Sequence, residues 1–269
     1  MSTSSTNAAC RALRFSVFIA LLFLFHNTLH GQNETDVSRH ALGYSLGFAR
    51  IKEENLLPKV HSGVLHALNY EFQVQGNLSH SVIVQLAYGT VSTDITRDEG
   101  AFNARLLVSY SPQFVVRRAG GMTYCMGPMI AYSSSLAEYQ TWDEAHAYWG
   151  TALSLGMSNV MSLDIGSARD LTFRLDCSLL GITSRPDRFR LYANERWTFS
   201  NLVKIMNSGF QYGFTEGVFQ LATTARYRTP LFSSKSLTLS CSFSYSRLNV
   251  DGGKPLREIV TSLEIGLWL

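Results

Sequence analysis

Eight charged side chains stand within segments that otherwise hold apolar, small or uncharged residues, and these are the side chains best placed to do chemistry. Four are acids and four are arginines: Glu71, Asp176, Glu258, Glu264, Arg105, Arg174, Arg226 and Arg228. A selective pore usually carries one sign of charge at its constriction. An even mixture favours ion pairs, because an isolated charge in a poorly solvated place is costly. We therefore expect a paired polar network that braces the wall around it or lets small solutes pass.

The residues around these charges alternate in the way that predicts β-strands. From Ser236 to Ser246, serine and threonine occupy every even position, while apolar or aromatic residues and one cysteine occupy every odd position. The last thirteen residues, Arg257 to Leu269, place Ile259, Leu263, Ile265 and Leu267 on one face. One face of each strand suits hydrocarbon and the other suits water.

This closing pair of strands resembles the C-terminus of small outer-membrane β-barrels of Gram-negative bacteria, although it indicates no specific functional family. The resemblance implies a transmembrane barrel in the outer membrane, in contact with outer-membrane lipids. It also implies that the final strand is the signal read by the barrel-insertion machinery. The chain departs from the pattern at its last residue, which is Leu269 rather than Phe or Trp.

The N-terminal region predicts export. Residues 1–31 contain Arg11 and Arg14, a largely apolar run from Phe15 to Phe25, and Gly31 as a small residue for cleavage. The apolar run is too short for a membrane anchor, since a spanning helix needs about 20 residues. We therefore divide the chain into a cleaved signal peptide, residues 1–31, and one barrel domain, residues 32–269. The mature domain keeps 21 basic and 20 acidic side chains, which gives no electrostatic reason to expect nucleic acid as a partner.

Twelve segments fit the length of a transmembrane strand, which is about nine to eleven residues. They are 39–51, 62–75, 81–91, 101–111, 120–132, 147–158, 169–181, 189–199, 203–213, 217–228, 236–248 and 257–269. The fold class is thus all-β, an antiparallel transmembrane barrel of about twelve strands. Alternation is poor between Ile182 and Phe214, so ten strands is the alternative, with a loop or short helix in that region. Counting back from a periplasmic C-terminus makes Pro112–Ala119 a periplasmic turn and Ser133–His146 an external loop.

Two other functions compete with a structural barrel or narrow pore. One is a soluble periplasmic β-barrel that binds a small ligand, in which the polar face would lie outside. The other is a lipid-modifying enzyme. Barrel phospholipases and lipid A deacylases place a His and a Ser two residues apart on an outward strand face, and none of the histidines beyond residue 31 has a Ser two residues later.

His66 or His61 would be the residue of such an enzyme, since His66 has outward parity near the outer rim. We expect no catalytic residue, no cofactor and no metal site, because the sequence shows no phosphate-binding glycine loop and no metal-ligand spacing.

Overall fold

The protein is described here by a computed structural model. The described residues are 37–53, 60–76, 78–93, 101–139, 146–185, 203–204, 206–207, 209–232, 235–250 and 254–269. The predicted signal peptide, residues 1–31, lies outside them. Within the described residues, no helix has the length and apolar character needed to cross a membrane.

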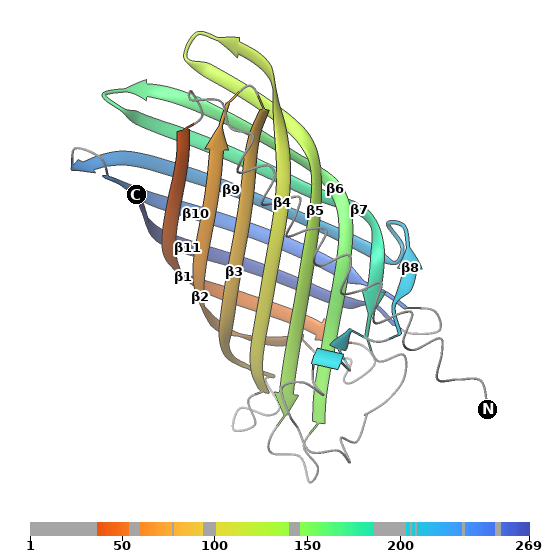
Figure 1. The fold of residues 1–269 in the computed structure, drawn as a ribbon. Coiled ribbons are helices and arrows are strands. Elements are labelled where there is room, and N and C mark those ends of the chain that lie inside the picture. The colour runs from red at the N-terminus through yellow and green to blue at the C-terminus, as the bar shows by residue number, and fades with distance from the viewer. Residues whose placement is uncertain are drawn as a thin grey trace. The chain divides into compact units, whose positions relative to one another are not determined.

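Ten antiparallel strands form a closed barrel, and one short strand, β8, pairs with the C-terminal end of β7 (Figure 1). The strands are β1 (Val37–Glu53), β2 (Val60–Gln75), β3 (Leu78–Ser92), β4 (Ala101–Ala119), β5 (Met122–Tyr139), β6 (His146–Gly166), β7 (Arg169–Ser184), β8 (Gln211–Gly213), β9 (Val218–Phe232), β10 (Lys235–Leu248) and β11 (Leu256–Trp268). Neighbours in sequence pair in turn, except that β9 pairs with β7 and β11 pairs with β1. Because β6 also pairs with β7, the ring has no open edge.

The alternation of the sequence becomes the inside and outside of the barrel. Along β1, Leu42 is 59% exposed while Ala49 is completely buried, and every residue between them switches face. The exposed positions are large and apolar, and the buried ones are glycine, alanine or serine. This arrangement places the polar face inside, as the prediction of a membrane-spanning barrel requires and the soluble alternative does not.

The expected twelve strands are replaced by ten in the closed wall, which was the alternative. β7 pairs directly with β9 from Asp170↔Arg228 to Ser178↔Gln220, so no other strand stands between them over this stretch. β8 pairs with β7 beyond it, from Gly181↔Gly213 to Thr183↔Gln211. Of the predicted strand 203–213, only Gln211–Gly213 forms a strand, and a helical turn near Met206 precedes it. The predicted strand 189–199 lies outside the described residues. The poor alternation in this region therefore correctly favoured the alternative of ten strands.

Two-residue turns join strands at one end of the barrel. Gly120 and Gly121 connect β4 to β5 with φ of 56° and 79°, a left-handed pair that glycine adopts without steric cost. Both ends of the described wall, Val37 and Leu269, lie at this same end, because an even number of strands returns the chain to it. In outer-membrane barrels the short turns are periplasmic, which makes the opposite end external.

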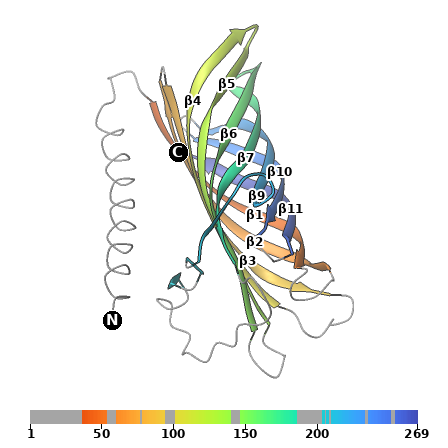
Figure 2. The same ribbon diagram turned by 90° about the vertical axis from the view of Figure 1, so that its right-hand side faces the viewer.

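Two predicted connections are wrong because the strands are longer than expected. Pro112–Ala119 belongs to β4, and Ser133–Tyr139 belongs to β5, so the external loop 133–146 shrinks to residues 140–145, which lie outside the described set. In Figures 1 and 2, the β4–β5 hairpin extends past the end of β3 at the periplasmic end, while β6 stays paired with β5 up to Met122↔Leu163. Its last contact with β3 is the pair Leu78↔Phe114.

The extended hairpin contains a local break in strand pairing. Pairing between β4 and β5 is regular up to Tyr110↔Ile130 and resumes at Phe114↔Met126. Pro112 and Pro128 lie in the gap, and neither has an amide proton to donate to the ladder. The two prolines thus interrupt the β4–β5 ladder, which has one further irregularity, a register shift between Val115 and Arg117.

Candidate functional site in the lumen

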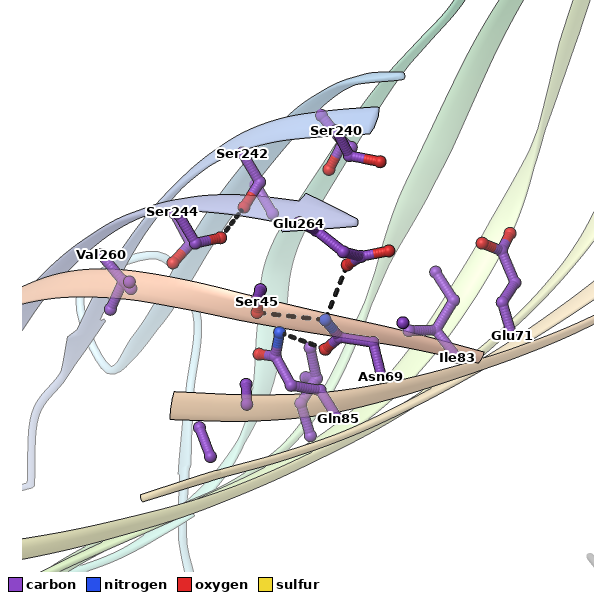
Figure 3. A pocket seen from close by; sticks show the side chains of 18 of the residues that line it. Ser45, Asn69, Glu71, Ile83, Gln85, Ser240, Ser242, Ser244, Val260 and Glu264 are labelled. Carbon is purple, nitrogen blue, oxygen red and sulfur yellow. Dashed lines mark hydrogen bonds between the residues drawn. The ribbon is translucent and has the colours of Figure 1, made fainter. Parts of the chain in front are cut away.

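The lumen holds a polar cavity of about 180 Å³ (Figure 3). Asn69 of β2 is its central residue. The Asn69 amide nitrogen donates to Glu264 Oε2 at 2.6 Å and to Ser45 Oγ at 3.1 Å, and its carbonyl oxygen accepts from Gln85 Nε2 at 2.7 Å. Four strands are therefore joined on the inner face through one buried amide.

Two ion pairs cross the lumen rather than linking adjacent strands. Arg226 of β9 contacts Glu71 of β2 at 2.6 Å between Nη1 and Oε2. Arg105 of β4 contacts Glu258 of β11 at 3.4 Å between Nη2 and Oε1. In each case three strands of the ring separate the partners. These pairs tie distant parts of the wall to each other and fill the space between them.

The other arginines of the predicted network are held in different ways. Arg174 Nε donates to both carboxylate oxygens of Asp176 on its own strand, at 2.8 and 2.9 Å. Its Nη1 reaches Ser81 Oγ at 3.0 Å, again across three strands. Arg228 Nε donates to Asp170 Oδ2 at 2.6 Å, on the adjacent strand β7. All four arginines of the network thus have an acidic partner.

Trp268 closes the periplasmic side of this layer. The indole lies inside the barrel and is 5% exposed, while its neighbour Leu269 faces outward. The guanidinium carbons of Arg226 and Arg228 lie 5.6 and 6.0 Å from the centre of the ring, which is cation–π distance. The indole therefore covers the two cations from the side where the chain ends.

An apolar layer occupies the external end of the lumen. Its buried residues come from strand ends all around the ring: Ile51, Val91, Ala101, Ala152, Val218, Leu248 and Leu256. A hydrophobic constriction of this kind resists the passage of water and ions. A second interior cavity of about 140 Å³ touches Leu248 and also Arg105 and Glu258. From the external end to the periplasmic end, the lumen contains the apolar layer, then the charged network, then the indole of Trp268.

The structure places all eight predicted network residues on the inner face, but it pairs only seven of them with an opposite charge. Glu264 makes its hydrogen bond with Asn69 and forms no ion pair within the described residues. Asp170 is the partner of Arg228, and the sequence reading missed it because it stands at the start of its strand. Asn69, Gln85 and Trp268 were also missed. These residues could have been identified in the same way as the charges, because they too occupy inward-facing positions of their strands.

The two histidines proposed for a lipid-modifying enzyme lie on opposite faces. His61 is buried on the inner face. His66 lies outside, with Nδ1 at 2.6 Å from the Tyr44 hydroxyl and its ring stacked on Tyr88. No group of three or more His, Cys, Asp or Glu side chains within the described ranges could hold a metal ion.

No protein-family model matches this chain, and no curated protein does. Solved structures do resemble it. The outer membrane protease OmpT of Escherichia coli aligns with 87% of this chain and 96% of its own, at 8% identity and a TM-score of 0.52. The translocator domain of the autotransporter NalP of Neisseria meningitidis aligns over 97% of both chains at 11% identity, with a TM-score of 0.46.

An outer-membrane channel of Pseudomonas putida F1 aligns with 88% of this chain and 97% of its own, at 10% identity and a TM-score of 0.40. Identities this low speak to fold and carry no activity across. The alignment with OmpT, the apolar outer face and the closed ring agree with the expectation from the closing strands. The chain has the fold of a Gram-negative outer-membrane β-barrel, with the outer membrane as its location.

Proposed function

We propose that the protein is a structural outer-membrane barrel whose lumen is braced shut, rather than a pore for small solutes. Two ion pairs across the lumen, Arg226–Glu71 and Arg105–Glu258, support this proposal. Each occupies the space that a solute would need, and each is neutralised by its partner. The apolar layer above them and Trp268 below them add two further barriers.

The pairing also explains why charges are tolerated in a narrow interior. Glu71 is 7% exposed at its side chain, so a lone carboxylate there would be strongly disfavoured. A channel that moved ions would need a hydrated path and binding weak enough to release them. Closely paired charges at 2.6 Å offer neither to a passing ion.

Conductance in planar lipid bilayers tests the proposal. The wild-type barrel is expected to show no steady single-channel current. Replacing both cross-lumen pairs by alanine (Arg226→Ala, Glu71→Ala, Arg105→Ala and Glu258→Ala) removes both members of each brace, so neither pair leaves an orphaned charge. This variant is expected to conduct.

A matched control removes a polar contact that does not cross the lumen. Ser242→Ala with Ser262→Ala deletes a 2.6 Å hydrogen bond between adjacent strands β10 and β11, and should leave the barrel closed. Heat-dependent migration on SDS gels verifies that each variant is a folded barrel. A steady current through the wild-type protein would contradict the proposal and favour the narrow pore.

A further inference from the structure

A group of basic residues lies on the outer face at the external ends of three adjacent strands. The strand register sets Lys52 of β1 opposite Arg257 of β11, and Arg257 opposite Arg247 of β10. Arg50 stands two residues from Lys52 and so shares its face. We call Arg50, Lys52, Arg247 and Arg257 the basic row.

The alternation of the strands fixes the direction of these side chains. The next residues along each strand, Ile51, Leu248 and Leu256, are buried in the apolar layer inside the lumen. Their neighbours in the basic row must therefore point outward. Arg50 and Arg257 are exposed, and Lys52 and Arg247 are partly so. The row faces the membrane side of the barrel, at the border between hydrocarbon and the external medium.

Like charges directly opposite each other in a sheet are unfavourable, so this arrangement needs a reason. Neither Arg50 nor Arg247 forms a hydrogen bond or ion pair with any side chain within the described residues, and Arg247 Nε is buried without a hydrogen-bond acceptor. Lys52 and Arg257 have contacts of their own, so the case rests on the two others. The four arginines of the lumen network, by contrast, each have an acidic partner. An anion from outside the protein would relieve the basic row.

The surface below the row is apolar. Phe48 of β1 and Ile259 and Leu263 of β11 follow on the same face toward the membrane centre, and Leu263 is 69% exposed. The corresponding outward positions near the external ends of β2, β3 and β4 are Ser62, Thr90 and Phe102, which carry no charge. A cationic rim above an apolar strip, with uncharged residues at the corresponding positions of β2, β3 and β4, matches a lipid with an anionic headgroup.

The width of the row distinguishes between kinds of lipid. Adjacent strands are about 4.8 Å apart, so the row spans roughly 10 Å from β1 to β10. A single phosphodiester is too small to neutralise cations over that width. A headgroup with two separated phosphates is better matched, and guanidinium groups bind phosphate oxygens in pairs.

We propose that the basic row is a binding site for a diphosphorylated, acylated glycolipid of the outer leaflet, with the phosphates on the cations and the acyl chains along Phe48, Ile259 and Leu263. The inference rests on the external orientation of this end of the barrel. It does not depend on whether the lumen is closed, so a conducting wild-type barrel would leave it untouched.

Native mass spectrometry of the full barrel in non-ionic detergent tests the site, with diphosphoryl lipid A as the probe. The wild-type protein is expected to retain one lipid A, and Arg50→Gln with Arg247→Gln to weaken its binding at least tenfold. The matched control, Arg117→Gln with Arg118→Gln, neutralises two exposed arginines at the periplasmic end and should bind as the wild type does. Equal affinity in the basic-row variant and the wild type would overturn the proposal.

Three further probes separate the possible sources of the anion. Lipid A without phosphates is expected to lose binding to the wild-type protein, a comparison that needs no variant to fold. Phosphatidylglycerol should bind at least tenfold more weakly than diphosphoryl lipid A. If phosphatidylglycerol binds equally well, or if millimolar inorganic phosphate displaces lipid A completely, the glycolipid assignment is wrong.

Discussion

The charges inside this barrel and the charges on its outer rim follow opposite rules. In the lumen, arginines and carboxylates are interleaved, and Arg226 and Arg105 reach across three strands to acidic partners. On the outer face of β10, β11 and β1, cations of one sign stand in register with each other. Each arginine of the lumen network has its counter-charge inside the protein, whereas the rim cations are arranged for an anion outside it.

The lumen charges and the rim charges differ because different counter-ions are within their reach. A lumen side chain has no bulk water or lipid headgroup beside it, so its counter-charge must be encoded in the same chain. A rim side chain can find anions in the membrane surface, so its sequence need not supply them. Breaking a lumen pair should therefore cost folding stability, while neutralising rim cations should change lipid binding alone.

The largest effect is expected from Arg226→Ala. The substitution leaves Glu71 buried without its ion-pair partner and removes one of the two cations over Trp268, at a cost of about 3–5 kcal/mol. Urea unfolding of the barrel in lipid vesicles measures it. Arg226→Met with Glu71→Leu removes both charges and should restore most of the lost stability. A double variant as unstable as Arg226→Ala would show that the charge pair itself, and not the orphaned carboxylate, carries the effect.

A smaller loss is expected from Arg105→Ala, about 1–3 kcal/mol in the same assay. Its pair with Glu258 is longer, at 3.4 Å, and Glu258 keeps a hydrogen bond from Ser246 Oγ at 3.3 Å. Arg105 also donates to Asn103 at 2.9 Å, which the substitution removes. A loss equal to that of Arg226→Ala would mean that pair distance does not rank the two braces.

Glu264→Gln should be milder still, within about 1 kcal/mol of wild type in urea unfolding. This carboxylate has no ion-pair partner within the described residues, and a glutamine can still accept from Asn69. Glu71→Gln is the matched comparison, because it makes the same change in a residue that is ion-paired. If Glu264→Gln destabilised the barrel as much as Glu71→Gln, the ion pair would not distinguish the two sites.

The smallest change in stability is expected from Arg257→Gln, under about 0.5 kcal/mol in lipid-free detergent, as for other exposed charges. Its effect should appear on binding of diphosphoryl lipid A, which it should weaken. Raising the salt concentration should weaken binding to the wild type in the same direction, because the row lies at the aqueous border. A stability loss above 2 kcal/mol would place Arg257 with the lumen braces.

The alternation of the strands predicted most of the wall, but it did not predict which side chains pair across the lumen. A period of two tells which residues share a face, so the inward position of all eight charges followed from the sequence. Which arginine meets which acid depends on the closure of the ring, since Arg226 and Glu71 are 155 positions apart in the chain and meet only because β11 pairs with β1. The strand count failed for a local reason: alternation is weak between Ile182 and Phe214, and twelve strands were counted where the β7–β9 pairing closes the wall with ten.

Pro112 of β4 and Pro128 of β5 separate two parts of the barrel that should open at different rates. With no donor at Pro112 or Pro128, fluctuations that open the hairpin tip need not spread into the wall beyond Tyr110 and Ile130. In the described strand pairings, residues 115–119 of β4 pair with β5 alone, because β3 ends beside Phe114, whereas residues 122–126 of β5 also pair with β6. Amide protons of residues 115–119 should therefore exchange with deuterium well before those of the β1–β11 seam. The β4 side of the periplasmic tip can open and close repeatedly while the braced lumen stays intact.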